Sequence, residues 1–342
     1  MASRSVLVIG ADGVLGATVA NTFTQAGWHV MRGSRKPDRS DAVLVDLTRP
    51  DTVAGAMSAA DLVVNAVPDS GLVAEGMAMA TGRRIMNLGT APHSSARNLR
   101  IRAAQQMQSG AVLLNAGLFP GVMNLVVAEL VRQYPEADEI EIAICLPLSG
   151  MSGPAGVNFV HENLTTIGRH GVYDYRSPRH ATLAVPFPDP IGRKKCFGFA
   201  ERDRGWISGV AGARPIRSYA YVDQRWLHSM ILALNPLGLL PYVPKAPFLI
   251  RRRTVPQSPS AEPIVHWVSV KKNGVRLAAR TVECSGVYRH AASASLVLAE
   301  GFLRAATHSG LTGCVNPEEI FSLGELEGLL AKEGIRVVPQ DC

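Results

Sequence analysis

Short apolar runs alternate with helix-length segments from Ser5 to about Tyr134. This alternation is typical of a parallel sheet covered by helices. Helices are expected at 14–26, 50–58, 71–80 and 94–109, and a glycine lies just beyond the end of three of them. The strand candidates are 6–9, 29–31, 42–45, 62–65, 84–87 and 112–115. The pattern therefore predicts an α/β fold with a doubly wound parallel sheet of the Rossmann type.

The pattern changes after Tyr134. Polar and apolar side chains alternate over 138–145, which is the period of a half-buried antiparallel strand. Further along, the apolar runs 264–270 and 275–282 flank Asn273-Gly274, a strong hairpin signal. A second domain with an antiparallel sheet is therefore expected.

Helical patterns return near the carboxyl end. The Ala- and Leu-rich span 291–307 predicts a long buried helix, and Asn316-Pro317 is expected to open a final helix over about 318–333. These helices are expected to pack back onto the first sheet. The resulting assignment is a Rossmann domain over 1–124, completed by carboxyl-terminal helices in 289–342, and an inserted α+β domain over 125–288.

Composition narrows the functional classes. The 342 residues are 47% hydrophobic and 18% charged, which excludes a disordered chain. Five cysteines without a Cys-x-x-Cys pair match neither a disulfide framework nor a structural zinc site, so a reducing, cytoplasmic location and no metal are expected. The net charge is +7, but the basic residues are scattered along the chain apart from Arg251 to Arg253. Nucleic-acid binding is therefore not expected.

A glycine-rich loop follows the first predicted strand and precedes an apolar helix. Residues 4–20 also have the outline of a signal peptide, but glycines interrupt the apolar stretch at the spacing of a phosphate loop. The first glycine permits a sharp turn, the second a close approach of pyrophosphate, and the third close packing of helix on strand. The residues expected to bind a dinucleotide here are Gly10, Asp12, Gly13, Val14, Leu15 and Gly16.

The end of the second strand bears on the choice of cofactor. A site that prefers NAD places an Asp or Glu here for the ribose hydroxyls. This chain has Arg32, Ser34, Arg35 and Lys36 instead, and no carboxylate is expected beside them. Cations and a hydroxyl suit a 2′-phosphate, so NADP(H) is predicted. The alternative is a solvated basic turn.

Other turns at the carboxyl ends of the strands are candidates for cofactor contacts. Asp46 is expected either near the adenine or as a helix cap. The turns that carry Ala66-Val67-Pro68 and Gly89 are expected to line the nicotinamide side. After the sixth strand, Gly121 and Asn124 either present a helix amino terminus to the ligand or form an Asn-capped helix start.

Several of these segments together resemble the saccharopine dehydrogenase-like family. They are the glycine loop, the Arg32 to Arg35 turn, 61–67, 115–124 and the closing segments 316–321 and 326–338. The resemblance implies a Rossmann domain completed by carboxyl-terminal helices, an inserted α+β substrate domain, NADP(H) use, and frequently a homodimer formed through the inserted sheet.

The chain departs from the saccharopine reductase pattern at two turns. Those enzymes carry a sequence like Gly-Leu-Asp-Pro-Gly at the sixth strand, and this chain has Phe119 in place of the Asp. The turn from Gly89 to His93 also lacks the Ser-Tyr pair that they carry after the fifth strand. Recognition of an amino-acid substrate is therefore not predicted. Short-chain dehydrogenases use Tyr-x-x-x-Lys, and no tyrosine here has a lysine four residues on, so that mechanism is not expected either.

The predicted reaction is hydride transfer to a small or moderately hydrophobic imine, carbonyl or enoyl compound. It needs a proton donor, and the candidates are His93, His161 and Tyr288. A non-catalytic NADP-binding or scaffold protein is one alternative. Another is a membrane-surface reductase of lipid or polyketide-like intermediates, because 227–253 is apolar and ends in arginines. Prolines within that segment argue against a membrane span.

Overall fold

The computed structural model describes residues 4–37, 40–69, 71–106, 109–148, 169–170, 173–174, 181–198, 205–212, 214–237, 239 and 262–340. These residues form two compact units. The first comprises 1–125, 205–207 and 288–333, and the second comprises 126–204, 208–287 and 334–342. Both units are therefore assembled from segments that are separated in the sequence.

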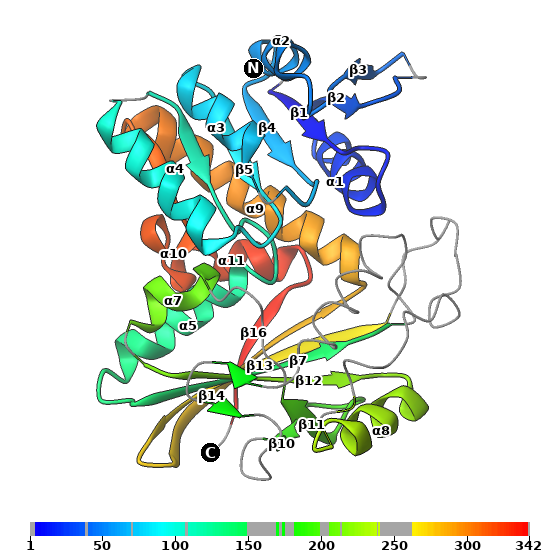
Figure 1. The fold of residues 1–342 in the computed structure, drawn as a ribbon, viewed down its shortest axis with the longest axis vertical. Helices are drawn as coiled ribbons and strands as arrows, with labels where there is room; N and C mark the ends of the chain where they lie inside the picture. The colour runs from blue at the N-terminus through cyan, green and yellow to red at the C-terminus, as the bar shows by residue number, and fades with distance from the viewer. Residues whose placement is uncertain are drawn as a thin grey trace. The chain divides into compact units, whose positions relative to one another are not determined.

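The first unit is built on a seven-stranded parallel sheet (Figure 1). Its order is β15-β6-β5-β4-β1-β2-β3, which is the Rossmann order with one added edge strand. The strands are β1 (Ser5–Ile9), β2 (His29–Ser34), β3 (Ala42–Leu44), β4 (Leu62–Asn65), β5 (Arg84–Asn87), β6 (Ala111–Leu113) and β15 (Gly313–Val315). The predicted fold class is confirmed, and β15 is a strand that the sequence pattern did not indicate.

Helices cover both faces of this sheet. The chain moves outward from β1 to β2 in one direction and from β4 to β5 in the other. Right-handed crossovers therefore place α1 and α3 on opposite faces. The helices of this unit are α1 (Val14–Gln25), α2 (Pro50–Ser58), α3 (Val73–Ala80), α4 (His93–Gln105), most of α9 (Val287–His308), α10 (Pro317–Ile320) and α11 (Leu323–Lys332).

The second unit contains a seven-stranded sheet of order β10-β11-β12-β7-β13-β14-β16. The sheet is mixed rather than purely antiparallel, because β12 and β7 run parallel. The predicted hairpin is confirmed, with Asn273 and Gly274 at positive φ. The strands are β7 (Glu139–Leu146), β10 (Thr182–Pro186), β11 (Arg193–Gly198), β12 (Ile216–Val222), β13 (Pro263–Lys272), β14 (Val275–Ser285) and β16 (Arg336–Gln340).

The remaining elements lie between these strands along the chain. They are α5 (Val122–Gln133), the strand pair β8 (Arg169–His170) and β9 (Tyr173–Asp174), α7 (Gly205–Ala211) and α8 (Arg225–Leu234).

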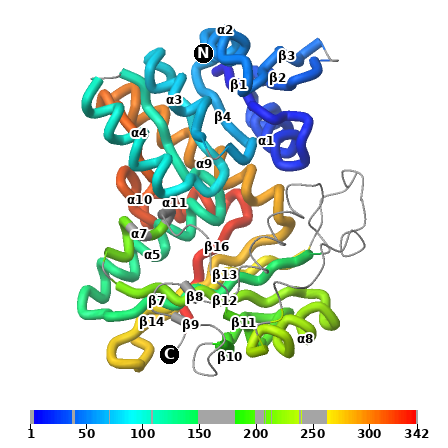
Figure 2. Tube along the Cα trace, viewed as in Figure 1, coloured from blue at the N-terminus to red at the C-terminus, as the bar shows by residue number. Residues whose placement is uncertain are grey.

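The carboxyl end differs from the expectation in two ways. The final helix is two helices, because Phe321 and Ser322 are extended and Ser322 caps α11 through a capping box with Glu325. The last strand, β16, pairs with β14 in the second sheet (Figure 2), whereas residues 289–342 were assigned to the first domain. Pro339 is compatible with this strand because β16 lies at the sheet edge.

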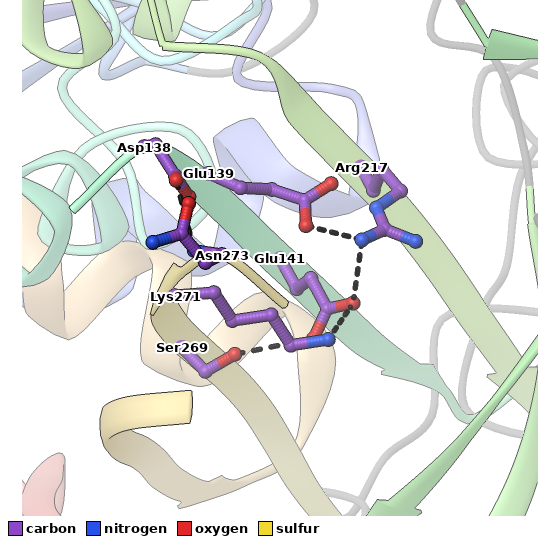
Figure 3. A network of polar contacts seen from close by, with 7 residues as sticks. All are labelled: Asp138, Glu139, Glu141, Arg217, Ser269, Lys271 and Asn273. Atoms are coloured by element: carbon purple, nitrogen blue, oxygen red, sulfur yellow. Dashed lines mark hydrogen bonds and ion pairs between the residues drawn. The ribbon is translucent and has the colours of Figure 1, made fainter. Parts of the chain in front are cut away.

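A charged network fixes the middle of the second sheet (Figure 3). The fully buried carboxylate of Glu141 on β7 accepts a hydrogen bond from Lys271 Nζ on β13 at 2.7 Å, and Arg217 on β12 lies 3.6 Å away on the other side. Arg217 also pairs with Glu139. Opposite charges are thus matched across three adjacent strands around one fully buried carboxylate.

Candidate cofactor site

The glycine loop between β1 and α1 has almost no space for side chains. Gly10 has a φ of +82°, and a Cβ placed on it would lie 2.5 Å from Val67 Cγ2. A Cβ on Gly16 would lie 2.1 Å from the carbonyl oxygen of Gly10. At Gly13 the nearest atom would be 3.3 Å away. Glycine is therefore required sterically at Gly10 and Gly16, where the loop packs against the β4 turn and itself.

The amino terminus of α1 is suited to an anion. Gly13 is the N-cap, no side chain caps the helix, and the first turn contains no acidic residue. The backbone N–H groups of Val14, Leu15 and Gly16 therefore combine with the positive end of the helix dipole. With the closely packed glycines beside it, this arrangement fits the pyrophosphate of a dinucleotide.

Arg32 is held by groups that the sequence did not bring together. Its Nε donates to Asp41 Oδ2 at 3.0 Å, and its Nη2 donates to Asn21 Oδ1 at 2.7 Å. The expectation that no carboxylate lies near the basic turn is wrong, because parallel pairing of β2 with β3 places Ala42 opposite Arg32 and so brings Asp41 beside it. Arg32 is already committed to two partners on the protein.

Ser34 is also engaged. Its hydroxyl donates to Asp12 Oδ2 of the glycine loop and accepts from the backbone N–H of Lys36 at 3.0 Å. Arg35 and Lys36 are exposed. The basic turn after β2 therefore has a carboxylate on either side, Asp12 and Asp41, and presents its exposed cations further along.

Asp46 lies at the start of the turn before α2. Its Oδ1 accepts hydrogen bonds from both the backbone N–H and the hydroxyl of Thr48, at 3.0 and 2.8 Å. These two bonds, with a smaller contribution from Arg35, hold the pKa of Asp46 below its usual range. The contacts favour a role in holding this turn, which is close to the capping alternative for Asp46.

A buried carboxyl group ties together the turns that follow β4 and β5. Glu75 Oε1 in α3 accepts from Asn65 Nδ2 at 2.9 Å and from Asn87 Nδ2 at 2.7 Å. Asn65 Oδ1 in turn accepts from the N–H of Val67, and Asn87 Oδ1 from the N–H of Gly89. One oxygen atom thus positions both turns that were predicted to line the nicotinamide.

Sequence reasoning missed Glu75. The residue is fully buried, its Oε2 has no hydrogen-bond partner in the described part of the chain, and burial raises its pKa. A neutral carboxyl group is the form that burial favours. No spacing or motif marks a single glutamate within a helix as the partner of two asparagines.

In the β4 turn, Ala66 and Val67 are half-buried and Pro68 is exposed.

Gly121 has a structural role in the turn before α5. Its φ is +132°, a Cβ there would lie 2.0 Å from Gly117 O, and its N–H donates to Asn124 Oδ1 at 3.1 Å. Of the two alternatives for this turn, the contacts therefore favour the Asn-capped start. Asn124 Nδ2 also donates to Glu318 Oε1 at 3.1 Å. Glu318 lies in α10, three residues after the end of β15, and is a second residue that sequence reasoning missed.

Two of the three proton-donor candidates lie within the described residues. His93 is the exposed first residue of α4 and directly follows the β5 turn, Tyr288 is half-buried in the first turn of α9, and His161 lies outside the described residues. Glu318 has a different environment: burial raises its pKa to about 7, although its hydrogen bond from Asn124 opposes this. The charge of the Glu318 carboxyl group therefore changes near neutral pH.

Neither a metal-binding cluster nor a membrane-spanning helix occurs in the described ranges. No cluster of three or more His, Cys, Asp or Glu side chains that could hold a metal occurs among these residues. No helix in the same ranges has both the length and the apolar character needed to cross a membrane. Of the apolar segment 227–253, α8 continues to Leu234, and residues 238 and 240–253 lie outside the described residues.

Comparison with known proteins supports the fold. No protein-family model matches the sequence, and no curated protein sequence does. Among solved structures, apo saccharopine dehydrogenase (L-Glu forming) from Saccharomyces cerevisiae superposes with a TM-score of 0.64, covers 99% of each chain and is 12% identical. The chain has a saccharopine dehydrogenase-like fold. The sequence resemblance to that family is therefore confirmed at the level of the fold.

Two other solved structures have lower TM-scores against this chain. An engineered D-amino acid dehydrogenase bound to NADP+ is 14% identical over 96% of each chain, with a TM-score of 0.49. The DAP dehydrogenase of C. glutamicum in complex with DAP is 13% identical over 96% of each chain, with a TM-score of 0.46.

Proposed function

We propose that this protein is an NADPH-dependent oxidoreductase. The observation that supports this most strongly is the glycine loop, in which Gly10 and Gly16 permit close packing beside the uncapped amino terminus of α1. The loop lies at the carboxyl end of β1, next to β4, where the strand order of the sheet reverses. Open α/β sheets bind their ligands at this position.

The preference for NADPH rests on the exposed cations after β2. Arg32 is held by Asp41 and Asn21, so Arg35 is the guanidinium best placed to grip a 2′-phosphate, with Lys36 beside it. Arg32 then acts mainly by holding the turn. Bound NADPH supplies the hydride, while the chain binds the dinucleotide and excludes water from the reacting atoms.

The substrate class follows from hydride chemistry. An imine, carbonyl or enoyl compound accepts the hydride and needs a proton donor, for which His93, His161 and Tyr288 remain candidates. The first unit is expected to bind the cofactor, and the second to bind substrate and form a homodimer. The expected location is the cytoplasm.

Fluorescence titration with NADPH and with NADH tests this proposal. Arg35→Ala should weaken NADPH binding about tenfold, because one charge-assisted contact to phosphate is lost, and should change NADH binding little. Arg193→Ala on β11 of the second sheet is the matched control and should leave both affinities unchanged. Equal losses for both cofactors in Arg35→Ala would refute the NADPH preference.

A non-catalytic NADP-binding protein is the second candidate. Phe119 lies in the turn where the saccharopine reductases that this chain resembles carry an aspartate, so the chain lacks that carboxylate. Oxidation of bound NADPH by a panel of imines, ketones and enoyl thioesters separates the two functions. Turnover of any panel member supports the enzyme, whereas binding without turnover across the panel favours the scaffold.

A further inference from the structure

Two carboxylates contact the described residues at the end of β2. Arg32 pairs with Asp41, and the hydroxyl of Ser34 donates to Asp12. Asp12 belongs to the glycine loop, 22 positions before Ser34, and is itself exposed. A carboxylate therefore stands at the carboxyl end of β2 after all, supplied by the loop rather than by the strand.

The position of the Asp12 carboxylate predicts which group of a bound cofactor it contacts. In Rossmann sites the group at the end of the second strand faces the adenosine ribose, and an acidic side chain there accepts a hydrogen bond from the 2′-hydroxyl. Asp12 Oδ2 is bonded to Ser34, which is the last residue of β2. The Asp12 carboxylate thus lies beside the end of β2, where an acidic residue was not expected.

The same contact weakens the grip on a phosphate. The Ser34 hydroxyl has one proton, and it is donated to Asp12 rather than being available to a phosphate oxygen. The negative charge of Asp12 also repels a 2′-phosphate, while Arg35 and Lys36 attract it. Cofactor choice at this site is therefore a balance between one loop carboxylate and the exposed cations that follow the strand.

We infer that Asp12 is the residue that sets the ratio of NADPH to NADH affinity, and that it keeps NADH a usable cofactor of this site. This inference rests on the proposed function and assigns its cofactor specificity. Asp12 binds the ribose 2′-hydroxyl of NADH, and it holds NADPH affinity below the value that Arg35 and Lys36 would otherwise give.

Two substitutions test the inference in opposite directions. Asp12→Asn keeps an oxygen acceptor for Ser34 but removes the charge, so NADPH should bind about tenfold more tightly and NADH no more tightly than before. Ser34→Ala leaves the Asp12 charge without its hydroxyl partner, so NADPH binding should weaken relative to NADH. Both dissociation constants are measured by nucleotide fluorescence on the full chain, independently of turnover.

Glu327→Gln is the control for loss of a negative charge. Glu327 is exposed on α11 in the same unit, so this variant should leave the affinity ratio unchanged. Thermal melting of each variant verifies folding. An unchanged NADPH to NADH ratio in a folded Asp12→Asn protein overturns the inference while the proposed function stands. Failure of the wild-type chain to bind either cofactor overturns the proposed function, and the inference with it.

Discussion

Replacing Glu318 by Gln removes a buried carboxyl group while keeping an oxygen that can accept the hydrogen bond from Asn124. Burial and the neighbouring Glu319 raise the pKa of Glu318 from 4.5 to about 7, against the opposing effects of the Asn124 hydrogen bond and Arg100. The unfolded chain loses this proton at lower pH than the folded protein does. Folding stability therefore falls as the pH rises from about 4.5 to about 7. The complete shift corresponds to about 3 kcal/mol.

Urea unfolding of Glu318→Gln and of the wild-type protein, near pH 5 and near pH 8 at constant ionic strength, measures this effect. The variant carries no titrating group at 318, so its stability relative to wild type should increase by about 2–3 kcal/mol between the two pH values. Glu327→Gln, at an exposed position of α11, should show no such pH-dependent gain. A Glu318→Gln gain that is equal at both pH values would refute the assignment of a raised pKa to this carboxyl group.

Two further predictions concern the cofactor site. Gly16→Ala should lower the unfolding free energy, because its Cβ would meet a backbone carbonyl oxygen at 2.1 Å. Gly13→Ala meets its nearest protein atom at 3.3 Å and should fold nearly normally, but its Cβ should hinder the close approach of pyrophosphate and weaken NADPH binding at least about tenfold. Urea unfolding and fluorescence titration measure the two effects, and a Gly13→Ala protein that binds NADPH as the wild type does would contradict the steric argument. Glu75→Ala should lower the unfolding free energy by about 3 kcal/mol and weaken NADPH binding, because two buried amide donors lose their acceptor. Glu75→Gln keeps a carbonyl acceptor and should restore most of both, and failure of that rescue would show that the two amides do not depend on this oxygen.

Hydrophobic periodicity predicted most of the fold because the central strands are buried on both faces. The runs at β1 and β4 are continuous apolar segments, and the hairpin at Asn273-Gly274 carries its own turn signal. The edge strands gave weaker patterns. β15 has only three residues, and β16 contains a proline, so neither resembles a strand until its partner is known.

The site was predictable only where one segment carries its own chemistry. The glycine loop is contiguous and its spacing reports its geometry, whereas the Arg32–Asp41 and Ser34–Asp12 contacts depend on which strands pair. Ser322 lies three residues before Glu325, and this capping-box pattern indicates the break between α10 and α11. The prediction of one helix over 318–333 did not take this pattern into account. Long-range contacts of this kind have no fixed sequence spacing.

The two carboxyl-terminal strands impose an order on synthesis. Gly313 pairs with Ala111, and β16 pairs with β14, so each sheet takes an edge strand from the final stretch of the chain. A nascent polypeptide can assemble β1 to β6 before residues 313–340 are synthesised, but the outer edges of β6 and β14 stay open until β15 and β16 pair with them. Exposed edges of this kind recruit strands from other chains. Protection of these two edges is therefore most needed between the synthesis of β14 and the pairing of β15 and β16, after the first sheet has largely formed.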